Sequence, residues 1–132
     1  MIQSTDLRIN NWTNHKNKNG SFDLQVEEIL TLGINVIYKK GVWFIRYEEI
    51  EPIPLTEEWL LKFGFEKKTF KSQPFGGICN FIKKYNNLIQ IVIIFHYGVF
   101  HLENEIMDSS IKSVHQLQNL YFALTGLELI DK

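Results

Sequence analysis

The residues best suited to covalent or metal chemistry lie in one stretch, from residue 78 to residue 103. It holds the single cysteine, Cys79, and the histidines His96 and His101. A cysteine beside a histidine can form a thiolate–imidazole pair, and one Cys with two His supplies three ligands of a zinc site. No CxxC, HxxxH or HxH spacing accompanies them. We therefore favour packing or a solvated face for these residues over ligand contact, and ligand contact over a metal or nucleophilic role.

Two tight turns divide this stretch into strands. Asn86–Asn87 and Tyr97–Gly98 each separate two apolar, β-prone runs. If both are two-residue hairpin turns, Tyr85 pairs with Leu88 and His96 with Val99. The core face of this sheet would then consist of Ile78, Ile82, Ile89, Ile91, Ile93, Phe95, Phe100 and Leu102. The opposite face would be amphipathic and would place Cys79, Ile94 and His101 side by side.

A second grouping combines aromatic and basic residues near residue 43. Trp43 and Tyr47 could stack on a planar ligand, while Lys40 and Arg46 could meet its phosphates. Trp12, His15, Lys16 and Lys18 form a similar group in the first loop. Because Trp43, Ile45 and Tyr47 alternate with Val42, Phe44 and Arg46, one of these two sets must face the core. Half of the aromatic side chains are therefore structural on either assignment.

The sequence thus predicts two sets of contact residues. The ligand-binding set is Trp43, Arg46, Tyr47, Lys40, His96 and His101. The partner-contact set lies on the polar side of the last helix and is His115, Gln116 and Asn119. That side also carries Lys112 and Gln118, and a polar stripe of this kind is more often a solvated face. We expect no metal site and no cofactor, since no glycine-rich phosphate loop or defensible triad occurs.

The elements that carry these residues predict an α+β fold. Residues 1–54 alternate in short strands separated by turn-prone segments, including 14–20, Gly33 and Lys40–Gly41. This pattern is typical of a small antiparallel sheet that curls into a barrel-like lobe. Pro52 and Pro54 then end the sheet.

Residues 55–132 form the second predicted region. Thr56 is a good N-cap for a short linking helix that ends at Gly64, with Phe65 placed for a Schellman motif. An antiparallel sheet follows, packed on one long helix that begins near Ser109 or Ser110 and ends at Gly126, a ββββα order. The two regions could also form one compact domain.

Composition bounds the function classes. At 132 residues the chain is long enough to bury a core without disulfides or metals, and its single cysteine is typical of a reducing compartment. Fourteen basic and fifteen acidic residues give a net charge of −1, which argues against nucleic acid as the partner. The N-terminus does not read as a signal peptide, and no apolar run is long enough to span a membrane. We expect a cytoplasmic location.

Three segments resemble a known group of proteins. They are DLRINNW, IEPIPLTEEWLLKFGFE and VHQLQNLYFALTGLEL. They are similar to small proteins of gut Bacteroidales bacteria and of their phages and prophages, a group with no established activity. In that group the first segment usually reads LRIGN, so Asn10 stands where glycine is usual. The resemblance implies a mobile-element protein that acts inside a bacterial cell, where binders of defence proteins or nucleotide messengers recur.

These observations favour a non-enzymatic, phage-associated binding protein. Its concrete form sequesters a small anionic, nucleotide-like ligand to counter host defence. The alternative is a protein–protein adaptor or inhibitor that binds a host protein through the last helix or a strand edge. A third interpretation is an enzyme that uses Cys79 with His101. A homodimer would bury Phe81, Val92 and Ile94 of the amphipathic sheet face.

Overall fold

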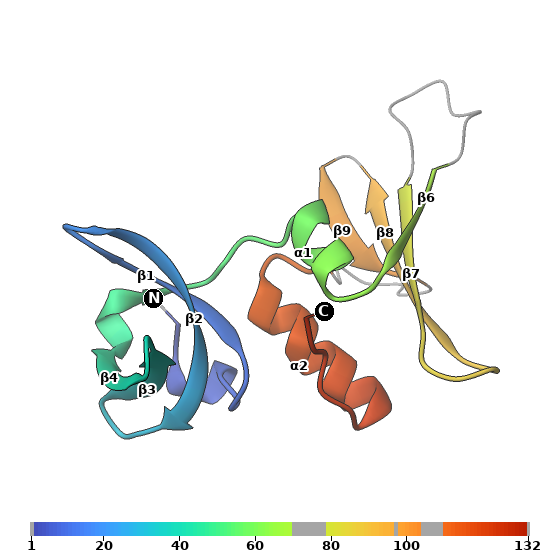
Figure 1. Ribbon diagram of the computed structural model, residues 1–132. Helices are drawn as coiled ribbons and strands as arrows, with labels where there is room; N and C mark the ends of the chain where they lie inside the picture. The colour runs from blue at the N-terminus through green and yellow to red at the C-terminus, as the bar shows by residue number, and fades with distance from the viewer. Residues whose placement is uncertain (1, 70–78, 97, 104–109, 132) are drawn as a thin grey trace. The chain divides into compact units, whose positions relative to one another are not determined.

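The computed structural model describes residues 2–69, 79–96, 98–103 and 110–131. It confirms an α+β fold and divides into two compact units (Figure 1). The first unit comprises Met1–Pro54 and Ser113–Glu128, and the second comprises Leu55–Lys112 and Leu129–Lys132. The sequence placed one boundary at residue 54. The structure instead returns the last helix to the first unit, because backbone bonds join Ser113 to Pro54 and Val114 to Ile53.

The first unit is built on a curled, antiparallel, five-stranded sheet that forms an open half-barrel (Figure 1). Its order is β4-β3-β2-β1-β5. The strands are β1 (Trp12–Asn17), β2 (Gly20–Ile29), β3 (Gly33–Tyr38), β4 (Gly41–Arg46) and β5 (Ile50–Glu51). Two 3-10 helices, η1 (Ser4–Asp6) and η2 (Tyr47–Glu49), flank them. The core on the concave side contains Ile2, Leu7, Leu24, Val26, Ile34, Val36, Ile45 and Ile50.

The turns of this sheet depend on unusual backbone angles. Asn10 adopts φ 78°, within the region that glycine favours and that asparagine tolerates better than most other residues. The β3–β4 turn consists of Lys39 and Lys40, both with positive φ, which is one residue before the expected Lys40–Gly41 turn. At Gly33, an added Cβ would lie 2.2 Å from the Ile45 carbonyl oxygen. Only glycine permits β3 and β4 to approach this closely.

The second unit begins with helix α1 (Glu57–Lys62), whose predicted caps are confirmed. The Thr56 hydroxyl accepts a hydrogen bond from the Trp59 backbone N–H at 3.3 Å. Gly64 adopts φ 88°, and the Phe65 N–H donates to the Leu60 carbonyl at 3.0 Å, as a Schellman ending requires. Leu60 and Phe63 are fully buried.

The second sheet has the order β6-β7-β8-β9, and its register corrects the sequence prediction. Its strands are β6 (Glu66–Thr69), β7 (Cys79–Lys84), β8 (Gln90–His96) and β9 (Val99–Leu102). His96 pairs with Val99 as predicted. Tyr85, however, donates to Ile89 rather than pairing with Leu88, because the Asn86 side chain accepts from the N–H groups of Leu88 and Ile89. The loop is therefore one residue longer than predicted, and each side chain of β7 lies on the opposite face of the sheet from the predicted one.

That slip exchanges the two faces of β7 alone. Phe81 now pairs with Ile93 on the core face, and Cys79 pairs with Phe95. Ile82 moves to the face opposite to the one predicted. The pairing of β8 with β9 sets Ile93 beside Leu102 and Phe95 beside Phe100 on one face, as predicted. Val92, on the opposite face, is nevertheless buried, and Ile78 and Tyr97 lie outside the described residues.

The last helix, α2 (Val114–Thr125), begins later than the sequence indicated. Ser113 is its N-cap and accepts from the Gln116 backbone N–H at 3.4 Å. Gly126, with φ 74°, ends it as predicted. Among the described residues, neither this helix nor α1 has the length and apolar character needed to cross a membrane.

Candidate functional site

A cavity of about 290 Å³ opens on the concave side of the half-barrel. Alternate residues of four strands point to this side, since successive side chains of a strand face opposite ways. Trp43 pairs with Val36, and His15 pairs with Phe22 across the neighbouring strands. Leu24, Val36 and Ile45 form the apolar floor of the cavity. The curl of the sheet therefore brings residues from distant parts of the chain to one mouth.

Four aromatic side chains line the cavity: Phe22, Tyr38, Trp43 and Phe44. Phe22 and Tyr38 meet edge to face, with ring centroids 5.9 Å apart. Trp43 is 59% exposed, and its indole Nε1 donates to the Tyr38 carbonyl at 3.3 Å. That bond holds the indole beside Gly41, at the base of the Lys39–Lys40 turn. Large apolar rings held in fixed orientations around a hollow are typical of small-molecule sites.

A short chain of hydrogen bonds fixes the His15 ring at the mouth. Its Nδ1 lies 3.1 Å from the Glu49 carbonyl oxygen, and its Nε2 lies 3.4 Å from the Asn17 amide nitrogen. A carbonyl oxygen can only accept and an amide nitrogen can only donate. His15 therefore donates from Nδ1 to the Glu49 carbonyl. This arrangement ties η2 to β1 and closes one side of the mouth.

Other polar groups at the mouth keep their hydrogen-bonding capacity. The Asn19 side-chain amide, the Glu49 carboxylate and the Tyr38 hydroxyl line or border the cavity. Within the described part of the chain, none of these three groups makes a side-chain hydrogen bond. The cavity thus combines stacking surfaces with uncommitted donors and acceptors, which is the pattern expected of a ligand pocket.

The structure brings together only part of the predicted ligand set. Trp43 lines the cavity, and Lys40 lies on the adjoining turn. Arg46 lies on the convex side, because it is one residue from the core-facing Ile45. Tyr47 belongs to η2, where it packs on the core and its hydroxyl donates to the Leu30 carbonyl at 2.5 Å. Arg46 and Tyr47 are therefore not pocket residues.

His96 and His101 belong to the second unit, so no single unit holds the whole predicted set. His101 pairs with Ile94, and Ile94 pairs with Asn80 rather than with Cys79. Cys79 therefore projects from the opposite face of the sheet to His101, and the proposed thiolate–imidazole pair is not formed. Across the residues the structure describes, no group of three His, Cys, Asp or Glu could hold a metal ion.

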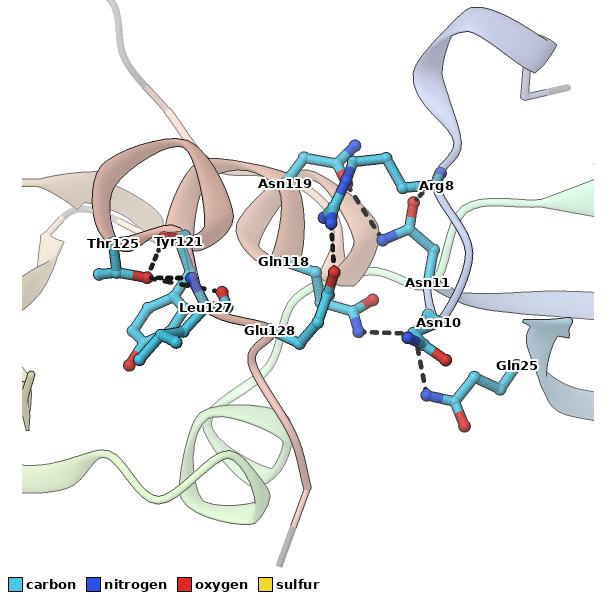
Figure 2. A network of polar contacts seen from close by, with 10 residues as sticks. All are labelled: Arg8, Asn10, Asn11, Gln25, Gln118, Asn119, Tyr121, Thr125, Leu127 and Glu128. Atoms are coloured by element: carbon cyan, nitrogen blue, oxygen red, sulfur yellow. Dashed lines mark hydrogen bonds and ion pairs between the residues drawn. The ribbon is translucent and has the colours of Figure 1, made fainter.

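The polar stripe of α2 is largely an internal contact (Figure 2). Gln118 is 1% exposed; its side chain accepts from the Trp12 N–H at 2.8 Å and donates to the Asn10 carbonyl at 3.0 Å. Asn119 accepts from the Asn11 amide at 3.1 Å and donates to the Asp6 carbonyl at 2.9 Å. We call this network the amide clasp, formed by Asn10, Asn11, Gln118 and Asn119.

The clasp changes the interpretation of the predicted partner-contact residues. Asn119 is committed to contacts within its own unit, whereas Gln116 is exposed. His115 is half-buried, and burial lowers its pKa, an effect that Asp6 partly opposes. Arg8 adds an ion pair with Glu128 and lies 3.8 Å from the centroid of the Phe122 ring. The helix face is thus mainly a packing surface of the first unit.

Sequence reasoning missed Phe22, Tyr38, Asn19 and Glu49 as members of the pocket. The local sequence pattern cannot show that the sheet remains open beside Phe22. Comparison of the chain with protein families, with curated proteins and with solved structures finds no match in any of the three.

Proposed function

We propose that this protein is a non-enzymatic binder that holds a small ligand with a nucleobase-like ring in the half-barrel pocket. The observation that supports it best is the convergence of Phe22, Tyr38 and Trp43 around a cavity of about 290 Å³. Aromatic side chains stack on any base and contribute about 1–3 kcal/mol per base. An apolar cavity with a few polar groups at its mouth suits a ring of this kind.

The polar groups at the mouth suit the edge of a base. The Glu49 carboxylate can only accept hydrogen bonds, and the Asn19 amide can both donate and accept. A ring that bears an amino group satisfies both residues, so adenine, guanine and cytosine fit better than uracil. The carboxylate also repels phosphate, which places the base inside and any phosphate outside.

The Lys39–Lys40 turn supports an anionic outer part of the ligand. Two-residue turns with positive φ at both positions strongly favour Asn-Gly, and left-handed backbone costs other residues about 1–2 kcal/mol each. Two lysines nevertheless occupy this turn, next to the Trp43 indole. We attribute this choice to the charge that they present. The pocket therefore supports the ligand proposed from the sequence, a nucleotide-like anion. Lys40 stays in the proposed set of ligand contacts, and Arg46 leaves it.

The biological setting of the proposal comes from the resemblance described above. A protein of a phage or mobile element that binds nucleotides in the host cytoplasm would lower the free concentration of a messenger. The alternative, an adaptor that contacts a host protein, is favoured by one observation, the exposed apolar side chains of Ile37, Val42 and Phe44.

A calorimetric titration with a panel of nucleosides, nucleotides and cyclic nucleotides tests the ligand proposal. We expect saturable binding, stronger for nucleotides than for the matching nucleosides and weakest for uridine. A panel that includes each base and shows no heat of binding would overturn the proposal. Binding that is unchanged by Trp43→Ala would place the ligand elsewhere and would also overturn it.

A further inference from the structure

Strand β4 is an edge strand of the first sheet. It is the terminal strand, and no other described strand pairs with its outer side. Natural edge strands are commonly guarded by lysine, proline or a bulge near their centre. The centre of β4, from Val42 to Ile45, contains none of these.

The hydrogen-bonding groups of β4 alternate between its two sides. The two-residue turn makes Tyr38 and Gly41 a hydrogen-bonded pair, so Gly41, Trp43 and Ile45 direct their backbone groups toward β3. The backbone N–H and C=O groups of Val42, Phe44 and Arg46 therefore point outward. The same strand also exposes apolar surface, since Val42 is 67% and Phe44 50% exposed.

Charges flank this strand in a self-complementary order. Lys39 and Lys40 precede it, and Glu48 and Glu49 follow it. Lys40 and Glu48 are equally far from Phe44 along the chain, and so are Lys39 and Glu49. All four charged residues are exposed. The lysines lie in the β3–β4 turn and the glutamates in η2, just outside the strand, so an antiparallel copy of β4 brings acid near base at both ends.

We propose that two copies of this chain pair through β4, antiparallel, about a two-fold axis at Phe44. Phe44 then lies opposite Phe44 of the second copy, and Lys40 lies near Glu48 of the second copy. The outward backbone groups of Val42 and Arg46 meet as a hydrogen-bonded pair. The contact is isologous, as a two-fold dimer requires.

The charge pattern selects this register over its neighbours. The outward backbone groups would also meet if the two-fold axis passed through Trp43. That axis, however, sets Arg46 opposite Lys40 of the second copy. An axis at Ile45 sets Glu48 opposite Val42 and loses both ion pairs. Of these three axes, only the one at Phe44 sets Lys39 and Lys40 near Glu49 and Glu48 of the second copy, with Arg46 opposite Val42.

Sedimentation equilibrium over a range of protein concentrations tests the proposal. We expect a reversible dimer with twice the 15.6 kDa mass of the chain, weakened by added salt because its ion pairs are exposed. The doubly reversed variants Glu48→Lys/Glu49→Lys and Lys39→Glu/Lys40→Glu should each dimerise about tenfold more weakly or worse. Lys16→Glu/Lys18→Glu changes the net charge equally, away from the strand, and should dimerise normally.

A mixture of the two reversed variants provides the decisive test. Each copy then faces opposite charges at both ends, so we expect the mixture to form a heterodimer of wild-type affinity. The quadruple variant, which exchanges all four charges within one chain, should dimerise with itself. A monomeric wild-type protein, reversed variants that dimerise like wild type, or a mixture that stays monomeric would each overturn the proposal. The quadruple variant shows whether the exchanged residues still permit the fold.

Discussion

The amide clasp and the half-barrel pocket contain similar polar residues, but within the part of the chain that the structure describes, those of the clasp are hydrogen-bonded and some of those at the pocket are not. Both include asparagine side chains from the first unit. In the clasp, Gln118 is 1% exposed and both ends of its amide are bonded. At the pocket, Trp43 is 59% exposed, and the Asn19 and Glu49 side chains keep free bonding capacity among the described residues. Uncommitted bonding capacity beside exposed rings, rather than polarity itself, distinguishes the candidate site.

The largest expected effect breaks the clasp. Gln118→Leu removes the acceptor of the Trp12 N–H and a donor to the Asn10 carbonyl, in a buried setting. Each lost partner costs about 1–3 kcal/mol, so we expect the free energy of unfolding to fall by about 2–4 kcal/mol. Urea denaturation measures it. Ala123→Gln, which places an amide at an exposed position of the same helix, is the control and should change stability by less than about 0.5 kcal/mol.

The next effect concerns the pocket and should appear in binding rather than in stability. Trp43→Ala removes a half-exposed ring, so we expect a nucleotide affinity loss of roughly 5- to 150-fold, from about 1–3 kcal/mol of stacking. Calorimetry provides the affinity, and thermal unfolding should show a small change. Val42→Ala, on the convex side of the same strand, should leave ligand affinity unaltered. If Trp43→Ala instead lowered the stability and left the nucleotide affinity unchanged, Trp43 would be a packing residue and not a ligand contact.

A smaller effect separates strain from charge at the β3–β4 turn. Replacing Lys39 by Asn and Lys40 by Gly supplies the residues that this turn prefers. We expect stability to rise by about 1 kcal/mol, while nucleotide affinity falls toward that of the matching nucleoside. Lys16→Ala/Lys18→Ala, which removes two charges from the neighbouring region, should change neither quantity as much. A rise in stability with undiminished nucleotide affinity would separate the lysines from the ligand.

The smallest effect is a pH dependence beside the clasp. Burial lowers the pKa of His115, so its protonation favours the unfolded chain. Its contribution to stability is present above the ordinary histidine pKa of about 6.5 and is lost as pH falls through the lower folded pKa. Urea titrations between pH 7 and about 5 should show this decline, and His115→Asn should make it shallower. If the pH dependence of stability were the same in His115→Asn, His115 would not be its cause.

The fold class followed from the sequence because its signals are local. Thr56, Gly64 and Gly126 act through the backbone next to them, and their roles were confirmed. The predicted β7–β8 register was wrong because the Asn86 side chain accepts hydrogen bonds from two backbone N–H groups and so lengthens the loop. The polar stripe of α2 could not be recognised as a packing face, because the partners of Gln118 and Asn119 lie more than 100 residues away.

The candidate site was predictable only in part for the same reason. Trp43 and Lys40 are close in sequence, so their grouping could be identified there. Phe22, Tyr38 and Asn19 join them only through the curl of the sheet, which depends on close approaches such as that at Gly33. Arg46 and Tyr47 do not line the cavity, because Arg46 alternates with the core-facing Ile45 and Tyr47 belongs to a 3-10 helix.

The most direct test follows the three tryptophan indole N–H signals by NMR during a nucleotide titration. The Trp43 signal, assigned by its loss in Trp43→Phe, should shift progressively and saturate. The signals of Trp12 and Trp59, which do not line the cavity, should remain in place. Shifts confined to Trp12 or Trp59, or no shift at any nucleotide concentration, would contradict a ligand pocket in the half-barrel.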